Sequence, residues 1–307
     1  MTNFVSAEDF FSSSISCGQR FWHLWTPENH QVLFTSEQDF KIGMNLIAIS
    51  ALLHPTVRVL TFELMSNHVH MTLIGTETAV HDLFNTFKKY LARHFEHQHY
   101  YVDLSNFVCS LRELRSVAEV RDVISYNNRN GFLVNPDTTP FSYRWGANRF
   151  FFNPDAKLRY AKDATKMTIR QRQKLTHGRA ADTLDNVMML DGYACPMCFC
   201  DIKTAESFYR NASDYLYCIS RNVESAKKIA EECGERVFYT DGELFRIVCA
   251  LADAKSKGTS PGLLPKDAKI EIAKTLHYDY NADNKKIARM LKLDISILNG
   301  MFTSRNS

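Results

Sequence analysis

Two histidines with one residue between them, His68 and His70, are the best candidates for metal chemistry in this 307-residue chain. They open the run HVHMTLIG, whose β-branched and apolar residues predict a strand. Because side chains alternate along a strand, both imidazoles point to one face and Val69 points to the other. Adjacent imidazoles commonly begin a divalent metal site that takes its third ligand from elsewhere. The alternative is a surface pair of histidines on a half-exposed sheet.

Tyr126 is the candidate nucleophile among the 13 tyrosines. It lies in VISYNNRNGFLV, in a helix expected to pack beside the sheet, and Asn130 follows one helical turn later on the same side. A tyrosine hydroxyl can attack a phosphodiester, and the phenoxide is a good leaving group when the step reverses. A divalent metal would polarise the phosphate. The alternative is that Tyr126 packs in the core and Asn130 caps the helix.

Three further residues near these groups suggest supporting roles. Glu63 lies across a turn from the histidine pair and could orient a ligating imidazole, although a solvated strand position is the commoner role. Tyr143 and Trp145 are expected to hold the loop that follows the tyrosine helix onto the domain.

The run Cys195-Pro-Met-Cys198-Phe-Cys200 raises the question of a zinc site. Structural zinc usually needs four ligands, often in two paired knuckles, whereas Cys218 and Cys233 stand alone. Buried free thiols are therefore the expected state.

The elements that must position these residues follow from hydrophobic periodicity and turn signals. Ser66-Asn67 predicts a tight turn between two strands. The order strand, helix, strand, strand, helix predicts an α+β fold of the ferredoxin-like α/β sandwich type, with an antiparallel sheet and helices on one face. The expected elements are a strand at 21–26, a helix at 36–53, strands at 57–65 and 68–74, a helix at 78–98, a strand within 101–111, and a helix at 115–129 that ends near Gly131.

Three regions are expected along the chain: a catalytic domain at 1–156, a basic linker or wrap at 157–199, and a mostly helical region at 200–307. Its tail, 266–302, predicts three short helices that resemble a helix-turn-helix, with a small closing bundle as the alternative. Asp283 is placed to cap the second of these helices, and Ile295, Leu298 and Phe302 are expected to face the core from the third.

Basic residues gather in two places, although the net charge of +3 is mild. Residues 157–179 carry eight lysines and arginines against Asp163 alone, and the helix at 78–98 carries a second set. Such residues neutralise phosphates without reading sequence, but charge runs are more often solvated surface. The candidate DNA contacts are Lys88, Lys89, Arg93, Arg129, Lys157, Arg159, Arg170 and Arg172.

The overall composition, 45% hydrophobic and 23% charged, is ordinary for a globular protein. No apolar run has the length of a membrane span, and the N-terminal residues lack the features of a signal peptide. The eight cysteines are scattered, so a reduced, cytoplasmic setting is expected.

The segment LMSNHVHMTLIG resembles the signature of the REP-associated tyrosine transposases and of the wider single-tyrosine HUH transposase family. Ser66 stands where that family usually has proline. The stretches VISYNNRNGFLV and TPFSYRWGANRFFF resemble its second signature, a tyrosine helix followed by a Tyr-x-Trp segment, with Asn130-Gly131 in place of the usual Asn-Pro. The resemblance covers about residues 20 to 155.

The resemblance implies an enzyme that cuts and rejoins single-stranded DNA next to a hairpin, through a 5′-phosphotyrosine at Tyr126. It implies Mg2+ or Mn2+ held by His68 and His70, with Asn130 completing or supporting the site. It also implies a bacterial, nucleoid-associated protein, possible as a homodimer. Two alternatives stay open: a hairpin-binding regulator that has lost cleavage, and a metal-dependent phosphoesterase that uses water.

Overall fold

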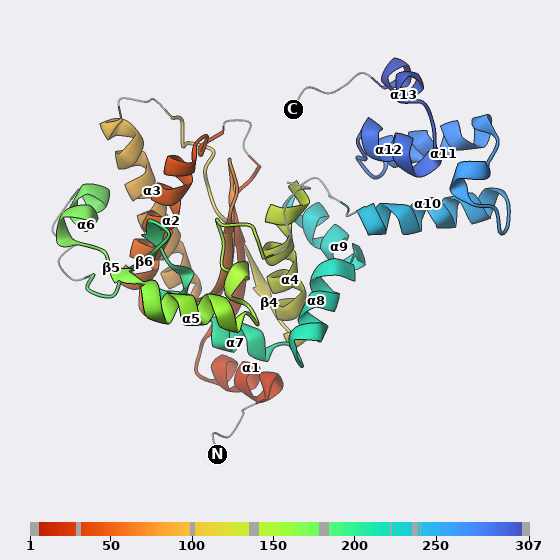
Figure 1. Ribbon diagram of the computed structural model, residues 1–307. Coiled ribbons are helices and arrows are strands. Elements are labelled where there is room, and N and C mark those ends of the chain that lie inside the picture. Colours follow the sequence, from red (N-terminus) through yellow and green to blue (C-terminus); the bar gives the residue numbers. More distant parts are fainter. Residues whose placement is uncertain are drawn as a thin grey trace. The chain divides into compact units, whose positions relative to one another are not determined.

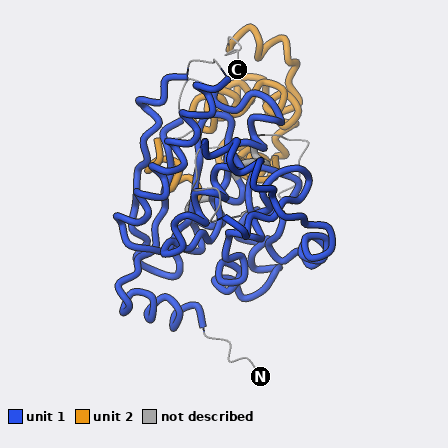
Figure 2. The backbone as a smooth tube through the Cα atoms, turned by 90° about the vertical axis from the view of Figure 1, so that its left-hand side faces the viewer, with its two compact units in different colours: residues 1–222 blue, residues 223–307 orange. Residues whose placement is uncertain are grey.

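The chain forms two compact units, residues 1–222 and 223–307, which Figure 2 colours separately. The structure is a computed structural model, and it describes residues 6–28, 32–98, 102–134, 141–177, 184–221, 223–234, 239 and 241–302. The expected boundaries at 156/157 and 199/200 both fall inside the first unit. The segment 157–199, expected to be a basic linker or wrap, contains helices and a small sheet.

A four-stranded antiparallel sheet, in the order β2-β3-β1-β4, organises the described part of the first unit. Two crossover helices connect β1 to β2 and β3 to β4, so the expected α+β fold class is confirmed. The elements are β1 Arg20–Trp25, α2 Glu37–Leu53, β2 Arg58–Leu64, β3 Val69–Gly75, α3 Glu77–His97 and β4 Ser110–Leu114.

The two faces of this sheet are covered differently (Figure 1). Helices α2 and α3 pack together over an apolar face, where α2 approaches the side chain of Leu64 at Gly43. Helix α4, Val117–Val134, packs on β2 and β3 from the opposite face. That second face is polar: Thr61 Oγ1 bonds Asn128 Oδ1 at 2.5 Å, and Asn127 Nδ2 donates to Thr72 Oγ1 at 2.9 Å.

Local signals explain several element boundaries. Helix α2 begins at a capping box, in which the Ser36 side chain accepts from Asp39 and the Asp39 side chain accepts from the backbone of Ser36. The expected C-cap at Gly131 is wrong, because α4 continues to Val134. A glycine inside a helix costs only about 1 kcal/mol relative to alanine, and packing of α4 on the sheet offsets it.

In the rest of the first unit, the sequence predicts helices after residue 200, but not the other elements. Helix α1 precedes the sheet, and a three-stranded sheet, β5-β6-β7, lies among short helices after the tyrosine helix. These elements are α1 Ala7–Ser16, η1 Asn148–Phe150, α5 Pro154–Asp163, β5 Thr165–Lys166, α6 Ile169–Thr176, β6 Met188–Leu190, β7 Tyr193–Ala194, η3 Pro196–Cys198, α7 Ile202–Ser207 and α8 Ala212–Arg221.

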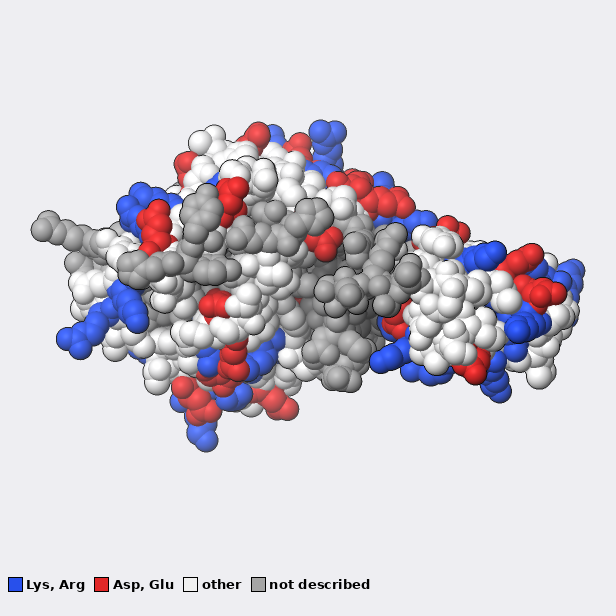
Figure 3. All heavy atoms as spheres, turned by 90° about the horizontal axis from the view of Figure 1, so that it is seen from above, with Lys and Arg blue, Asp and Glu red and all other residues white. Residues whose placement is uncertain are grey.

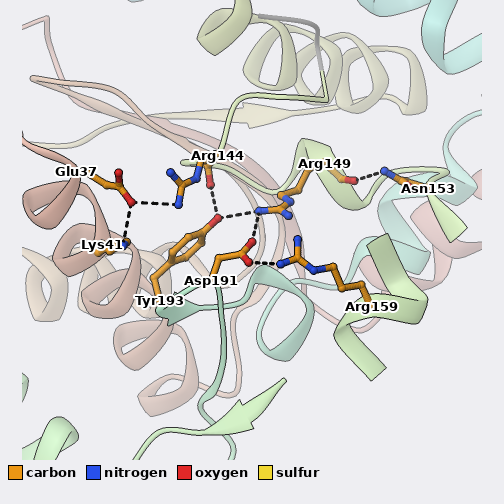
Figure 4. A network of polar contacts seen from close by, with 8 residues as sticks. All are labelled: Glu37, Lys41, Arg144, Arg149, Asn153, Arg159, Asp191 and Tyr193. Atoms are coloured by element: carbon orange, nitrogen blue, oxygen red, sulfur yellow. Dashed lines mark hydrogen bonds and ion pairs between the residues drawn. The ribbon is translucent and has the colours of Figure 1, made fainter. Parts of the chain in front are cut away.

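A polar network ties the segment after α4 to this small sheet and to α2 (Figure 4). The Tyr193 hydroxyl donates to the carbonyl of Arg144 at 3.2 Å and accepts from Arg149 at 2.9 Å. Arg149 also pairs with Asp191 at 3.1 Å, and Arg144 pairs with Glu37 at 3.2 Å. The network fixes the segment around Trp145, whose carbonyl accepts a hydrogen bond from the backbone of Leu64 in β2 at 2.8 Å.

The second unit is helical in its described residues, with α9 Val223–Cys233, α10 Asp241–Lys255, η4 Pro261–Leu263, α11 Lys266–Tyr278, α12 Asn284–Leu291 and α13 Ile295–Met301. The three short helices expected in the tail are present. Asp283 caps α12 by accepting from the backbone of Lys286 at 2.8 Å, as expected. Leu298 and Phe302 are buried, but Ile295 is 38% exposed, because it lies at the exposed first turn of α13. None of the described helices has the length and apolar composition needed to cross a bilayer.

Candidate active site

The β2–β3 hairpin brings His68 and His70 together. His70 lies in β3, and His68 directly precedes this strand. The two imidazole ring centroids are 5.1 Å apart, and the ring planes stand at 86°. Both side chains are buried, so the alternative of a surface pair is wrong. The adjacent Asn67 side-chain oxygen lies 2.7 Å from His68 Nδ1 and holds that ring.

Tyr126 reaches the same place from α4. Its ring centroid is 5.7 Å from that of His70, and the two planes stand at 81°. The tyrosine is only 4% exposed. The expected convergence of a phenol with the histidine pair is therefore present in the fold, at the interface between α4 and the polar face of the sheet.

A third histidine, His23, joins this group from β1, and it had not been expected. Trp25 pairs with His70 and His23 with Thr72 across β1 and β3, so His23 and His70 lie on one face. His23 Nε2 lies 3.3 Å from His70 Nδ1, and the rings stack at 5.6 Å between centroids. The sequence shows His23 only as a single histidine in FWHLWT. Its neighbours depend on the order of the strands in the sheet, which the local sequence does not specify.

Glu63 also belongs to this group. It pairs with His70 across β2 and β3 and is 1% exposed, so its expected place as a solvated strand position is wrong. Burial, together with the charge of Glu63, raises the pKa of Tyr143 well above its usual value. Tyr143 donates its hydroxyl to the Leu64 carbonyl at 2.6 Å, and thus holds the loop on the domain as expected.

Gly146 lets that loop approach β2. Its backbone forms an isolated bridge with Glu63, and a Cβ there would lie 2.9 Å from the Phe62 carbonyl oxygen. Any larger residue would push the backbone away from the strand that carries Glu63.

Side chains on the polar face of α4 form a buried network of hydrogen bonds next to Tyr126 in the sequence. Asn128 donates to the Tyr215 hydroxyl at 2.8 Å, and Tyr215 donates in turn to Asn148. Asn148 closes the network by donating to the carbonyl of Asn128 at 2.8 Å. Satisfied buried networks of this kind hold a single packing arrangement, here that of α4 on the sheet. The backbone of Asn130 is in α4, but its side chain lies outside the described part, so its role as a ligand stays a prediction.

Nitrogen and oxygen donors lie on the same face of this sheet. His23, His68 and His70 offer imidazole nitrogens, and Glu63 offers carboxylate oxygens. Imidazole suits ions such as Zn2+, Fe2+ and Ni2+, whereas Mg2+ and Mn2+ prefer oxygen ligands. The described donor set is therefore richer in nitrogen than the expected Mg2+ would favour.

Comparisons with protein family models, curated proteins and solved structures find no match for this chain. The interpretation of the site therefore depends on its geometry and chemistry, and the transposase signature stays a resemblance.

The expected DNA contacts are spread over several environments. Lys89, Arg159 and Arg170 are exposed, and Lys88, Arg93 and Lys157 are half-buried. Arg129 and Arg172 are buried, and in this conformation neither lies on the surface. Several of these charges are paired within the chain: Lys157 with Glu206 at 2.6 Å, Arg159 with Asp191, and Arg172 with Asp185 at 3.4 Å.

The surface charge is mixed accordingly. On the face seen in Figure 3, lysines and arginines stand beside aspartates and glutamates. Two arginines that the sequence did not single out, Arg144 and Arg149, line an open pocket of about 520 Å³ with Asp191. Both arginines are already paired with acids, Arg149 with Asp191 and Arg144 with Glu37.

In the 195–200 run, Cys195 and Cys200 are buried and Cys198 is half-buried. Burial raises the pKa of Cys195 to about 12 and that of Cys198 to about 11, and it raises the pKa of Cys200 well above its usual value. Within the described residues, these three thiols form no group tight enough to hold a metal. All three are free of disulfides.

Proposed function

We propose that this protein is a metal-dependent tyrosine nuclease and strand transferase that acts on single-stranded DNA. The observation that carries the proposal is the approach of Tyr126 to His70, with ring centroids 5.7 Å apart, where His70 is itself paired with His68. A phenol beside clustered imidazoles suits cleavage through a covalent phosphotyrosine, with the phenol as nucleophile and the imidazoles as metal ligands.

In this proposal the Tyr126 hydroxyl attacks the scissile phosphorus and forms a 5′-phosphotyrosine bond. The bond from phosphorus to the 3′-oxygen breaks, and the released 3′-hydroxyl takes up one proton while the tyrosine loses one. Attack by a second 3′-hydroxyl reverses the step and joins new ends. When bound by His68 and His70, a divalent metal would stabilise charge on the phosphate. The hydrogen-bonded α4 keeps Tyr126 in position, which favours reaction by holding the reacting groups together.

We propose that the second unit binds DNA next to the cleaved strand. Its support is the arrangement of α12 and α13, joined by a turn in which Lys292 adopts the left-handed conformation with φ of 49°. Two helices joined by a short turn resemble a helix-turn-helix, in which the second helix enters the major groove. A folded hairpin offers both duplex and single strand.

The alternative function is a hairpin-binding regulator without cleavage. The observation that favours it is the 4% exposure of Tyr126, because a phosphate can reach the hydroxyl only after neighbouring groups move. This alternative expects tight hairpin binding and no covalent product with any metal. A water-dependent phosphoesterase, in contrast, would cut DNA without Tyr126.

The test is incubation of end-labelled single-stranded hairpin DNA with the full chain and Mg2+, Mn2+, Zn2+ or no metal, followed by denaturing electrophoresis. We expect a metal-dependent protein–DNA adduct that disappears in Tyr126→Phe and persists in Tyr278→Phe, a control at an exposed tyrosine. Cleavage that survives Tyr126→Phe supports the phosphoesterase, and hairpin binding without any product supports the regulator.

A further inference from the structure

His23 and His70 form a hydrogen-bonded pair in the interior of the sheet. His23 Nε2 lies 3.3 Å from His70 Nδ1, and the rings stack with an interplanar angle of 22°. Both side chains are at most 1% exposed. Their strands are antiparallel neighbours, so the separation is set by the sheet and not by a flexible loop.

A hydrogen bond between two imidazoles requires one nitrogen to carry the proton and the other to accept it. If His70 donates from Nδ1, its proton resides there and its Nε2 carries a lone pair. If His23 donates instead, the neutral His70 carries its proton at Nε2 and cannot bind metal through that atom. The hydrogen-bond partner of His70 Nδ1 therefore decides whether His70 Nε2 can bind a metal.

The surroundings favour a positioning role for His23 over simple packing. Its ring lies 5.0 Å from that of Trp25 and 6.2 Å from that of Tyr126, so aromatic neighbours hold it on two sides. A ring so confined can direct one hydrogen bond precisely. Metal-binding histidines commonly use their second nitrogen to bond a partner of this kind, which fixes the ring and its tautomer.

We infer that His23 is a positioning residue that accepts a hydrogen bond from His70 Nδ1–H and thereby presents the His70 Nε2 lone pair to a divalent metal. The inference rests on the proposed function in that it takes His70 as a metal ligand. It adds a residue of β1 to a site that otherwise consists of the histidine pair at β3 and Tyr126 on α4.

The first test is independent of DNA and of activity. In the full chain labelled with 15N-histidine and kept free of metal, long-range proton–nitrogen correlation spectra report which ring nitrogen carries each proton. We expect His70 to be protonated at Nδ1 and bare at Nε2, with its signals assigned by their loss in His70→Gln. A His70 ring protonated at Nε2 would overturn the inference.

The second test compares two replacements of His23. His23→Gln keeps a side-chain oxygen that can accept the bond, whereas His23→Phe keeps an aromatic ring without an acceptor. For Mn2+ and Zn2+ binding measured by calorimetry, we expect the Phe variant to lose about 10- to 100-fold in affinity. We expect the Gln variant to keep most of it, with thermal unfolding to check that both fold.

The remaining outcomes are decisive. Equal losses in the Gln and Phe variants would make His23 a ligand or a packing residue, and unchanged binding in the Phe variant would show that it does not position His70. If the tautomer and metal results are as expected but no Tyr126 adduct forms, the proposed function fails and the role of His23 stands.

Discussion

Tyr126 and His70 face each other across the interface between α4 and β3, with ring centroids 5.7 Å apart and planes at 81°. The next residue on the helix, Asn127, donates to Thr72 on the same strand at 2.9 Å. The hydrogen bond and the ring contact lie side by side, so the register of α4 on the sheet sets the distance between phenol and imidazole. Changes that loosen this interface should reduce activity as well as stability.

Tyr215→Phe is expected to destabilise the first unit by about 1–3 kcal/mol, because Asn128 and Asn148 both lose a buried partner. Urea unfolding measures the change. Tyr278→Phe is the matched control, since Tyr278 is 63% exposed, and we expect it to shift stability by less than about 0.5 kcal/mol. Equal effects of the two substitutions would mean that the buried network does not hold α4.

Gly43→Ala is expected to destabilise the chain by about 1–3 kcal/mol through overpacking. An added Cβ would lie 2.5 Å from Leu64 and 2.8 Å from Phe34, between α2 and the apolar face of the sheet. At Gly300, within α13, nothing lies within 4 Å, so Gly300→Ala should be neutral or stabilising. The thermal unfolding temperatures of both variants measure these effects. A Gly43→Ala variant that unfolds at a higher temperature than the wild type would contradict the packing described for α2.

Asp201 should make stability depend on pH in acid. Its burial acts to raise the pKa, but hydrogen bonds from Arg58 and Thr204 and the Arg58 charge outweigh burial, so the pKa lies below its usual value. The unfolded chain then binds the proton more tightly, and the stabilisation is present above pH ~4 and is lost as pH falls through the folded pKa.

Asp201→Asn keeps a capping side chain for α7 but removes the charge that pairs with Arg58 at 3.1 Å. Because both side chains are partly exposed, we expect a loss of only about 0.5–1 kcal/mol at pH 7, which shrinks below pH ~4. Unfolding curves at pH 7 and pH 3 measure it, with exposed Asp163→Asn as control. A constant difference at both pH values would argue against the ion pair.

Cys195 and Cys198 should react slowly with iodoacetamide at pH 7.5, because burial raises the pKa of their thiols to about 12 and about 11. Exposed Cys17 is the internal control, and we expect its labelling to be more than ~10-fold faster. Mass spectrometry of the native protein after brief labelling gives the ratios. Rapid labelling of Cys195 would show that the segment around η3 opens readily.

The sheet and its two crossover helices could be predicted because their signals are local. Alternation in HVHMTLIG and the turn at Ser66-Asn67 define the hairpin, and helical spacing defines α2 and α3 within a few residues. The cap at Asp283 depends on a side chain that bonds its own helix, so sequence alone is sufficient to place it.

The rest of the site depends on pairings between distant strands. His23 joins His70 because β1 lies beside β3, and Glu63 lies on a strand that α4 packs on and that the loop at Gly146 pairs with. The basic stretch at 157–179 is another case, since its charges pair with Glu206, Asp185 and Asp191 from later in the chain. Hydrophobic periodicity cannot show which acidic residue, distant in the sequence, will lie close to a given basic residue in the fold.

The identity of the residue that becomes linked to DNA tests the central claim most directly. The wild-type chain is incubated with a single-stranded hairpin substrate and Mn2+, the covalent product is digested with protease and nuclease, and the nucleotide-bearing peptide is sequenced by mass spectrometry. The account predicts a phosphonucleotide on Tyr126. Attachment to another residue, or efficient cleavage with no attached nucleotide, would contradict it.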